Sequence, residues 1–233
     1  MNSQFIIGMS GKKQSGKNTM CDYLLNRIEN LFGEGSCKIY SFADAIKEKV
    51  CIDVLGLEYE QCYGTDKQKN SLTAYKWDNL PHEIKYSNRL NYSQYQVPEE
   101  EIGGYIYPKG YMTAREVMQI VGTDMFRNFF DDDIWVNATF RNIKKEGCKI
   151  VLISDVRFPS EIEGIIRNNG TVVRLLRDIC EKDIHASETA LDHFDFNCDN
   201  CIIFDNKEMG IKQQNQAMAP LFEEILRNKE IQS

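Results

Sequence analysis

The chain has 233 residues, a formal net charge of −7 at pH 7, 42% hydrophobic residues and 27% charged residues. This length is enough for one well-packed domain with an inserted subdomain, and the composition is that of an ordinary globular protein. The negative charge disfavours general nucleic-acid binding, which needs a basic stripe, and no apolar stretch is long enough to span a membrane.

The hydrophobic pattern alternates between short apolar runs and segments of helical periodicity. Strands are predicted at residues 4–9, 37–42, 149–155, 171–177 and 201–204. Helices are predicted from about 17 to 32 and at 43–56, 113–130, 132–146 and 159–170, with one more after the last strand. Strands that alternate with helices favour a parallel sheet flanked by helices on both faces. The fold class is therefore predicted to be α/β.

Two segments interrupt this alternation. Residues 57–112 are rich in Tyr, Asn and Gly, which predicts either an insertion with little regular structure or a small subdomain. Residues 178–199 predict a polar loop region. We therefore expect a single domain over 1–233 that carries these two additions.

The stretch between the first strand and the first helix has the pattern of a phosphate-binding loop. Gly11 is followed, after four residues, by Gly16 and Lys17. Glycines let the backbone curl so that its N–H groups face phosphate oxygens, the helix N-terminus adds partial positive charge, and the lysine reaches the terminal phosphates. Asn18 stands where Ser or Thr usually binds magnesium, and Thr19 follows it. The stretch predicts a nucleotide site and leaves its metal ligand open.

Two further sets of residues suit phosphate transfer. Asp155 ends a predicted strand, where a carboxylate can hold magnesium beside the phosphate loop, and Arg157 follows within reach of transferring phosphates. Arg115 and Gln119 lie one turn apart on a predicted helix. An Arg that binds phosphate beside a Gln that hydrogen-bonds a base edge suits a nucleoside monophosphate. On spacing alone, two solvated polar residues explain this pair equally well.

Five ordered motifs resemble the deoxynucleoside monophosphate kinases encoded by tailed bacteriophages. They are GKKQSGKNT, SFADAIKEK, REVMQIVGTDMFRNFFDDDIWV, ISDVRFPSEIEGIIRNNGTVVRLLR and HASETALDHFDF. The resemblance covers most of the chain outside 57–112. It implies an adenylate-kinase-like P-loop NTPase fold with an acceptor-binding region at 57–112 and a lid at 178–199. The implied reaction transfers the γ-phosphate of ATP to a dNMP, with Mg²⁺, and gives a dNDP and ADP.

The resemblance also assigns residues to roles. ATP is assigned to Gly11, Ser15, Gly16, Lys17, Asn18, Thr19 and Asn206. Catalysis is assigned to Lys17, Asp155, Arg157 and Arg177, and the metal ion to Thr19 and Asp155. The dNMP is assigned to Asp44, Lys47, Arg115, Gln119 and Arg174.

Several of these assignments have open alternatives. Arg174 and Arg177 are candidates for clamping phosphates in a closed state. Asp44 is equally well explained as the cap of the following helix. Asn206, in FDNKEMG, is a hypothetical adenine contact, because this stretch departs from the Asn-Asp-Gly of the family. The motif residues His185, Ser187 and Glu188 match the lid without an assigned role.

The eight cysteines are scattered along the chain, which, without a secretory signal, indicates free thiols in a reducing cytoplasm. Five Cys and His residues gather near the presumed lid, namely Cys180, His185, His193, Cys198 and Cys201. The spacing of Cys198 and Cys201 is that of zinc ligands, but no second close pair accompanies it. Free thiols are therefore preferred over zinc.

Two alternative functions stay open beside the dNMP kinase. One is a related P-loop kinase with another acceptor, such as dephospho-coenzyme A, and the other is an ATP-driven binding or regulatory protein. The expected ligands are ATP, Mg²⁺ and a dNMP, with no nucleic-acid or membrane partner. The Tyr-rich insertion is a candidate for lining the acceptor site or for a homodimer contact. The expected location is the cytoplasm, that of the host if the protein is phage-encoded.

Overall fold

The structure is a computed structural model that describes residues 4–81, 99–102, 105–178 and 189–228. The described residues form two compact units. The first takes those within 1–42, 136–182 and 187–233, and the second those within 43–135. Each unit has its own apolar core, and each is described by itself below.

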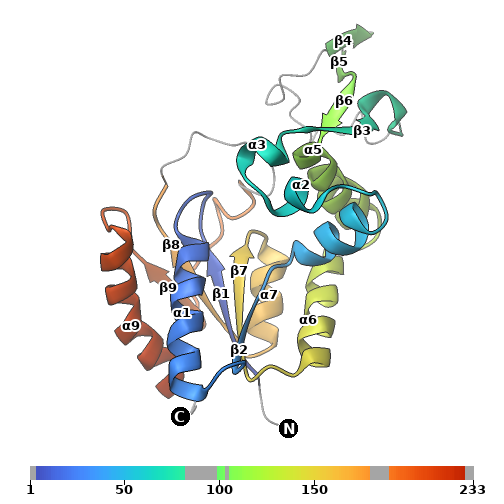
Figure 1. The fold of residues 1–233 in the computed structure, drawn as a ribbon. Helices are drawn as coiled ribbons and strands as arrows, with labels where there is room; N and C mark the ends of the chain where they lie inside the picture. The colour runs from blue at the N-terminus through green and yellow to red at the C-terminus, as the bar shows by residue number, and fades with distance from the viewer. Residues whose placement is uncertain (1–3, 82–98, 103–104, 179–188, 229–233) are drawn as a thin grey trace. The chain divides into compact units, whose positions relative to one another are not determined.

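A five-stranded parallel sheet forms the centre of the first unit (Figure 1). Its strands are β1 (Phe5–Ser10), β2 (Cys37–Tyr40), β7 (Ile150–Val156), β8 (Thr171–Leu175) and β9 (Cys201–Phe204). They lie in the order β2-β7-β1-β8-β9, and every neighbouring pair is parallel. The predicted α/β fold is confirmed.

Strand β1 shows why helices cover both faces of this sheet. All of its residues are buried, and alternate side chains point to opposite faces. Phe5, Ile7 and Met9 pack with helices α1 (Lys17–Phe32) and α9 (Ile211–Asn228). Ile6 packs in a second cluster with α6 (Ile134–Glu146) and α7 (Pro159–Arg167). A strand that is apolar on both faces needs two helical layers, as its continuous apolar run predicts.

The second unit consists of short helices and antiparallel strands. Its elements are η1 (Ala45–Ile52), α2 (Tyr59–Tyr63), α3 (Asp66–Lys69), β3 (Leu72–Lys76), η2 (Trp77–Asn79), β4 (Glu99–Ile102), β5 (Tyr105–Pro108), β6 (Tyr111–Thr113), α5 (Ala114–Gln119) and η4 (Ile120–Arg127). β3 pairs with β6, and β4 with β5. Its core surrounds the buried indole of Trp77. The described part of 57–112 thus contains regular structure.

The helices of the second unit differ from the predicted ones in geometry. Residues 45–52 and 120–127 form π-helices, and the latter continues directly from α5. A hydrophobic pattern does not distinguish a π-helix from an α-helix over one or two turns, because the two differ by less than one residue per turn. Within the described residues, no helix is long and apolar enough to cross a membrane.

Candidate active site

The turn between β1 and α1 has the backbone of a phosphate-binding loop. β1 ends at Ser10, and α1 begins at Lys17, with Gly16 at its N-cap at φ +97°. Side chains strongly disfavour this φ, and a Cβ on Gly16 would lie 2.7 Å from Gln214 Oε1. No acidic residue occupies the first turn of α1, so no carboxylate there opposes the partial positive charge of the helix N-terminus. Position 16 therefore requires glycine.

Lys17 is only 7% exposed, and its ammonium group lies against its own loop. Nζ donates to the carbonyl oxygens of Gly11 at 2.7 Å and Lys12 at 2.8 Å, and it lies 4.0 Å from Asp155 Oδ1. Burial lowers the pKa of Lys17 to about 8, although the Asp155 carboxylate opposes this shift. An anionic ligand at this position would stabilise the buried charge.

Asp155 and Arg157 lie at the carboxyl end of β7, beside β1. Arg157 Nε donates to Asp155 Oδ1 at 2.7 Å, and the Arg157 backbone N–H donates to Glu161 Oε2 at 2.7 Å. The Asp155 side chain remains 23% exposed. The structure therefore brings Lys17, Asp155 and Arg157 together at one edge of the sheet, where parallel sheets place their ligands.

Arg174 also lies at this edge, on β8. Its Nη1 donates to Ser10 Oγ at 2.9 Å, and its guanidinium carbon lies 5.0 Å from the centre of the Phe196 ring. Burial lowers the pKa of Arg174. The register that pairs Ser10 with Arg174 explains the contact. Arg174 therefore lies beside the strand that leads into the phosphate loop.

Asn206 and Arg177 are engaged inside the first unit. Asn206 is fully buried, and its Nδ2 donates to Ser15 O at 2.8 Å and to Gln214 Oε1 at 2.7 Å. Its Oδ1 accepts from the Arg177 backbone N–H at 2.9 Å. The Arg177 guanidinium donates to the carbonyl oxygens of Asn206 and Met209. A side chain buried in this way does not favour the hypothetical adenine contact of Asn206.

The loop has features that fit a nucleotide phosphate and its metal ion. The Ser15 hydroxyl is buried and has no hydrogen-bond partner within the described part of the chain. A Cβ on Gly11 would lie 2.4 Å from that hydroxyl, so glycine leaves room for it. On the first turn of α1, Asn18 is exposed and Thr19 is half-buried. Thr19 and Asp155 offer the oxygen ligands that Mg²⁺ prefers.

Arg115, assigned to the acceptor, already has polar partners in the second unit. Its Nη2 donates to Asp66 Oδ1 at 2.6 Å, and its Nε donates to Asn70 Oδ1 at 2.9 Å. These contacts use the edge of the guanidinium group that carries Nε and Nη2. Gln119 lies one turn later on α5 and is half-buried.

Asp44 and Lys47 share one neighbour, Tyr63 on α2. The Tyr63 hydroxyl lies 3.2 Å from Asp44 Oδ1 and 3.3 Å from Glu48 Oε1, and Lys47 Nζ lies 4.7 Å from the ring centre. Burial and these carboxylates raise the pKa of Tyr63. The Asp44 side chain makes no cap hydrogen bond to η1, so the capping alternative is wrong. Tyr63 was not singled out from the sequence, because nothing local marks it.

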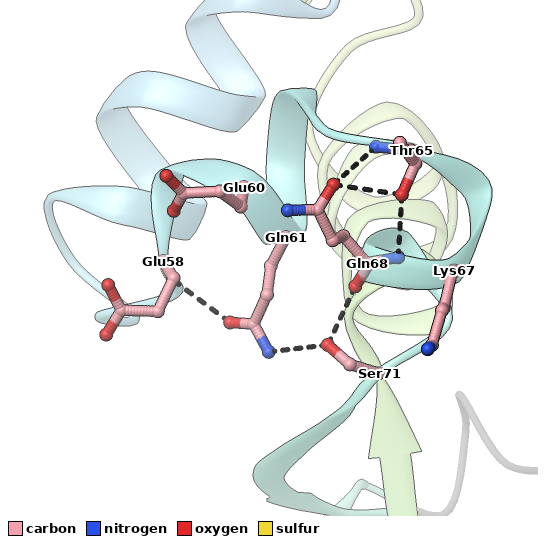
Figure 2. Close-up of a pocket in the computed structure, with 7 residues that line it drawn as sticks. All are labelled: Glu58, Glu60, Gln61, Thr65, Lys67, Gln68 and Ser71. Carbon is pink, nitrogen blue, oxygen red and sulfur yellow. Dashed lines mark hydrogen bonds between the residues drawn. The ribbon is translucent and has the colours of Figure 1, made fainter.

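A pocket in the second unit lies over α2 and α3 (Figure 2). It is lined by Glu58, Glu60, Gln61, Thr65, Lys67, Gln68 and Ser71. Gln61 and Gln68 use their side-chain oxygens to accept from the backbone N–H groups of Glu58 and Thr65. These are capping contacts of short helices, so the polar lining is explained by local structure.

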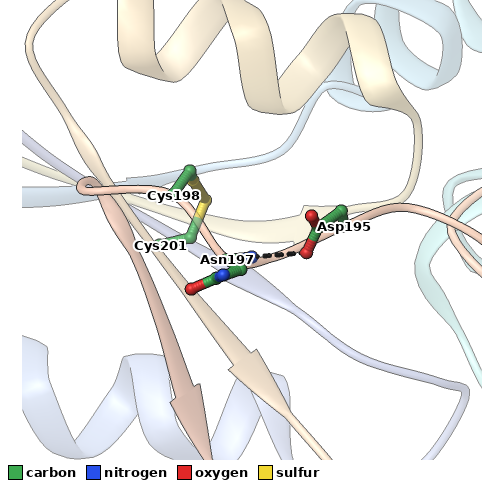
Figure 3. Close-up of a disulfide and its surroundings, with 4 residues drawn as sticks. All are labelled: Asp195, Asn197, Cys198 and Cys201. Carbon is green, nitrogen blue, oxygen red and sulfur yellow. Dashed lines mark hydrogen bonds between the residues drawn. A yellow bond between two sulfur atoms is a disulfide. The ribbon is translucent and has the colours of Figure 1, made fainter.

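Cys198 and Cys201 form a disulfide, which corrects the prediction of free thiols at these positions (Figure 3). The turn that leads into β9 brings their Cα atoms to 5.2 Å, within the range that a disulfide requires. Bonded sulfurs offer no thiolate to zinc, and no cluster of His, Cys, Asp and Glu in the described ranges could hold a metal ion. Cys180, His185, Ser187 and Glu188 lie outside the described residues.

A phosphate loop at the edge of a parallel sheet, with a carboxylate and an arginine on the adjacent strand, defines a P-loop nucleotide-binding protein of the kinase type. Residues 74–213 match the family described as deoxynucleotide monophosphate kinase. The chain is 30% identical over 198 residues to a protein of Acanthamoeba polyphaga mimivirus that carries a provisional name as a deoxynucleotide monophosphate kinase, with 80% of this chain and 81% of the relative covered. It is 26% identical over 192 residues to the deoxynucleoside-5′-monophosphate kinase of Escherichia phage T5, with 70% and 72% covered.

The chain belongs to the deoxynucleotide monophosphate kinase family. The resemblance seen in the five sequence motifs is thereby confirmed. The protein is a phosphotransferase that acts on deoxynucleoside monophosphates. The two alternative functions, a kinase with another acceptor and an ATP-driven binding or regulatory protein, therefore lose their support.

Proposed function

We propose that this kinase uses ATP and Mg²⁺, that residues of the first unit bind ATP, and that residues of the second unit bind the dNMP. The observation that carries the proposal is the buried ammonium group of Lys17, which lies within a glycine-rich loop and close to Asp155. A buried cation held by backbone carbonyls is suited to an anionic ligand of high charge.

The first unit supplies positive charge where the transferred phosphoryl group carries its negative charge. Lys17 binds the terminal phosphates, and Arg157, which is oriented by Asp155, binds the oxygens that gain charge during transfer. Asp155 and Thr19 hold the metal ion. Mg²⁺, when bound, supplies further charge neutralisation at the phosphates. Arg174 adds a second, half-buried guanidinium group at this edge.

The second unit supplies the acceptor contacts. Arg115 binds the monophosphate, and Gln119 hydrogen-bonds the base edge. Because Asp66 and Asn70 hold one edge of the Arg115 guanidinium, the phosphate either uses the other edge or replaces Asp66. Asp44 and Lys47 contribute polar groups held together by Tyr63.

Oligomeric state and location complete the proposal. The Tyr-rich insertion remains our candidate for a homodimer contact. The proposed location is the cytoplasm, because the nucleotide substrates are found there. It is the cytoplasm of the host if the protein is phage-encoded.

A panel of reactions tests the proposal directly. The protein is incubated with ATP, Mg²⁺ and each deoxynucleoside and ribonucleoside monophosphate in turn, and the products are separated by chromatography. We expect a dNDP and ADP in equal amounts with at least one dNMP. Release of ADP without a diphosphate product from any acceptor would contradict the proposal.

A further inference from the structure

Two buried polar side chains far from the phosphate loop in sequence contact its backbone. Asn206 is 0% exposed and Gln214, on the first turn of α9, is 1% exposed. Burial of an amide side chain is unfavourable unless its polar atoms are hydrogen-bonded. Their contacts therefore show what the fold gains from burying them.

The contacts of both side chains end at consecutive carbonyl groups of the loop. Asn206 Nδ2 donates to Ser15 O at 2.8 Å, and Gln214 Nε2 lies 3.4 Å from Gly16 O. Asn206 Nδ2 also donates to Gln214 Oε1 at 2.7 Å, which joins the two amides. Gly16 O additionally accepts the Met20 N–H of α1 at 3.0 Å. The loop is thus held from one side through its carbonyl oxygens.

Because peptide geometry is fixed, these contacts also determine the direction of the N–H groups of the loop. In a trans peptide the C=O and the following N–H point in opposite directions. When Ser15 O and Gly16 O point towards Asn206 and Gln214, the N–H groups of Gly16 and Lys17 point the other way. Those are N–H groups at the N-terminus of α1, which bind phosphate in loops of this kind.

Arg177 fixes the position of Asn206 itself. Its backbone N–H donates to Asn206 Oδ1 at 2.9 Å, which determines which end of the amide faces the loop. Its guanidinium group donates to Asn206 O at 3.1 and 3.3 Å and also to Met209 O. Arg177 therefore holds the turn that carries Asn206.

We infer that Arg177, Asn206 and Gln214, here called the Asn206 cluster, position the phosphate loop for the triphosphate of ATP. The members are positioning residues, because they act through the loop backbone and not by touching the nucleotide. The inference rests on the proposed function, since it takes the loop to be the ATP site. It replaces the adenine contact predicted for Asn206 and the phosphate clamp predicted for Arg177.

The two roles for Asn206 differ in the part of the nucleotide that they affect. If Asn206 positions the loop, loss of this positioning weakens the binding of any ligand with a polyphosphate, including inorganic tripolyphosphate, which has no base. If Asn206 contacts adenine, loss of the contact changes the preference between ATP and GTP and leaves tripolyphosphate binding unchanged. The affinities of ATP, GTP and tripolyphosphate therefore separate the roles.

The experiment compares Gln214→Met with Gln213→Met by calorimetry with tripolyphosphate and ATP and by steady-state kinetics. Gln213 is the adjacent glutamine. Its Oε1 accepts a hydrogen bond from the Gly210 N–H, and among the described residues it makes none to the loop. It is therefore a matched control for the loss of one amide. We expect Gln214→Met to weaken the binding of tripolyphosphate and ATP about tenfold, because the amide that contacts Gly16 O and accepts from Asn206 is lost. Gln213→Met should leave both affinities unchanged. The ratio of ATP to GTP affinity and the KM for the dNMP should stay constant.

Wild-type binding of tripolyphosphate by Gln214→Met, or a changed ratio of ATP to GTP affinity, would overturn the inference. If Gln214→Met does not fold, as judged by circular dichroism, Gln214→Asn takes its place, because it keeps the amide but shortens its reach. Failure of the proposed function gives a different result. In that case the wild-type protein itself does not bind tripolyphosphate, or binds it equally well after Lys17→Ala.

Discussion

The phosphate loop and the helix that carries Arg115 hold their principal cations in different ways. Lys17 is 7% exposed, and backbone carbonyl groups of its own loop accept its hydrogen bonds. Arg115 is 27% exposed, and the side chains of Asp66 and Asn70 accept its hydrogen bonds. Backbone partners are fixed by the fold, whereas side-chain partners can be changed by one substitution. The comparison predicts that substitutions of single partner residues cannot change how Lys17 is held in the ATP site. They can change how Arg115 is held in the dNMP site.

The largest effect is expected for Lys17→Ala. Removal of the buried ammonium group takes away charge stabilisation of the transferred phosphoryl group, and we expect turnover to fall by about 10³-fold. The fold should persist, because the hydrogen bonds of the Lys17 ammonium group go to the carbonyl oxygens of its own loop. Turnover assays with a thermal melt check both statements. Near-wild-type turnover would refute the assignment of the phosphate loop.

Arg115→Ala is expected to cost about 2–4 kcal/mol in kcat/KM for the dNMP, because a charge-assisted contact to the phosphate is lost. ATP affinity should stay the same. Gln119→Ala should change the ranking of bases more than the overall rate. Because both residues hold one ligand, their effects should be non-additive. Kinetics of both single variants and of the double variant with several dNMPs measure this, and strictly additive effects would separate the two residues.

Asp155→Asn should lower turnover about 100-fold and raise the Mg²⁺ concentration needed for half the maximal rate, because a neutral amide is a weaker ligand for Mg²⁺. The measurement is a Mg²⁺ titration of both proteins at saturating nucleotide. An unchanged titration curve would leave Asp155 as a partner of Arg157 alone.

The pH dependence of nucleotide binding should also reflect the buried lysine. The pKa of Lys17 is lowered to about 8 by burial, so the free protein loses this charge as the pH rises through that value. We expect ATP affinity to fall by up to about tenfold per pH unit above 8. Calorimetry between pH 7 and 10 with Lys17→Arg as the control tests this, since arginine stays charged. A parallel decline in both proteins would assign the effect to another group.

The same pKa shift should raise the stability of the folded protein as the pH rises, whereas it lowers the affinity for ATP. Because the folded-state pKa lies below the unfolded value, the unfolded chain binds more protons between pH 8 and 10.5. The contribution of Lys17 to the free energy of unfolding should therefore rise with pH across this window. Comparison with Lys17→Met in denaturant titrations isolates that contribution.

The smallest effect is expected for Asp66→Asn, which removes the carboxylate that pairs with Arg115. Exposed ion pairs contribute about 0.2–1 kcal/mol, so release of Arg115 should lower the KM for the dNMP by no more than about fivefold. Lys49, which pairs with Asp53, offers an exposed control pair, in which Asp53→Asn should change nothing. A higher KM in Asp66→Asn would mean that Asp66 orients Arg115 and does not compete with the phosphate.

Local patterns were sufficient to predict the sheet and the phosphate loop. The apolar run of β1, the two glycines and Lys17 are adjacent in sequence, and the physical reasons for the turn lie in those residues. The position of Asp155 beside the phosphate loop could be predicted, because the carboxyl ends of parallel strands share one edge. Each of these inferences depends on backbone geometry over a few residues.

The missed features depend on contacts between distant side chains. Gln214 contacts Gly16 across 198 positions of sequence, and Arg115 finds Asp66 across 49. Tyr63 joins Asp44 and Lys47 from another helix. The residue types do not identify these pairs. The sequence around an amide, a carboxylate or a tyrosine looks the same whether the side chain makes such a contact or is solvated. The Cys198–Cys201 disulfide was not predicted for another reason, because two cysteines at this short spacing suit a zinc site, a disulfide or free thiols equally well.

The central claim is that ATP and the dNMP are bound by separate sets of residues, in the first and second units respectively. Its most direct test is calorimetry of ATP and of a dNMP with Lys17→Ala and Arg115→Ala side by side. We predict that Lys17→Ala loses ATP binding and keeps the dNMP, and that Arg115→Ala loses the dNMP and keeps ATP. Equal weakening of both ligands by both variants would contradict the claim.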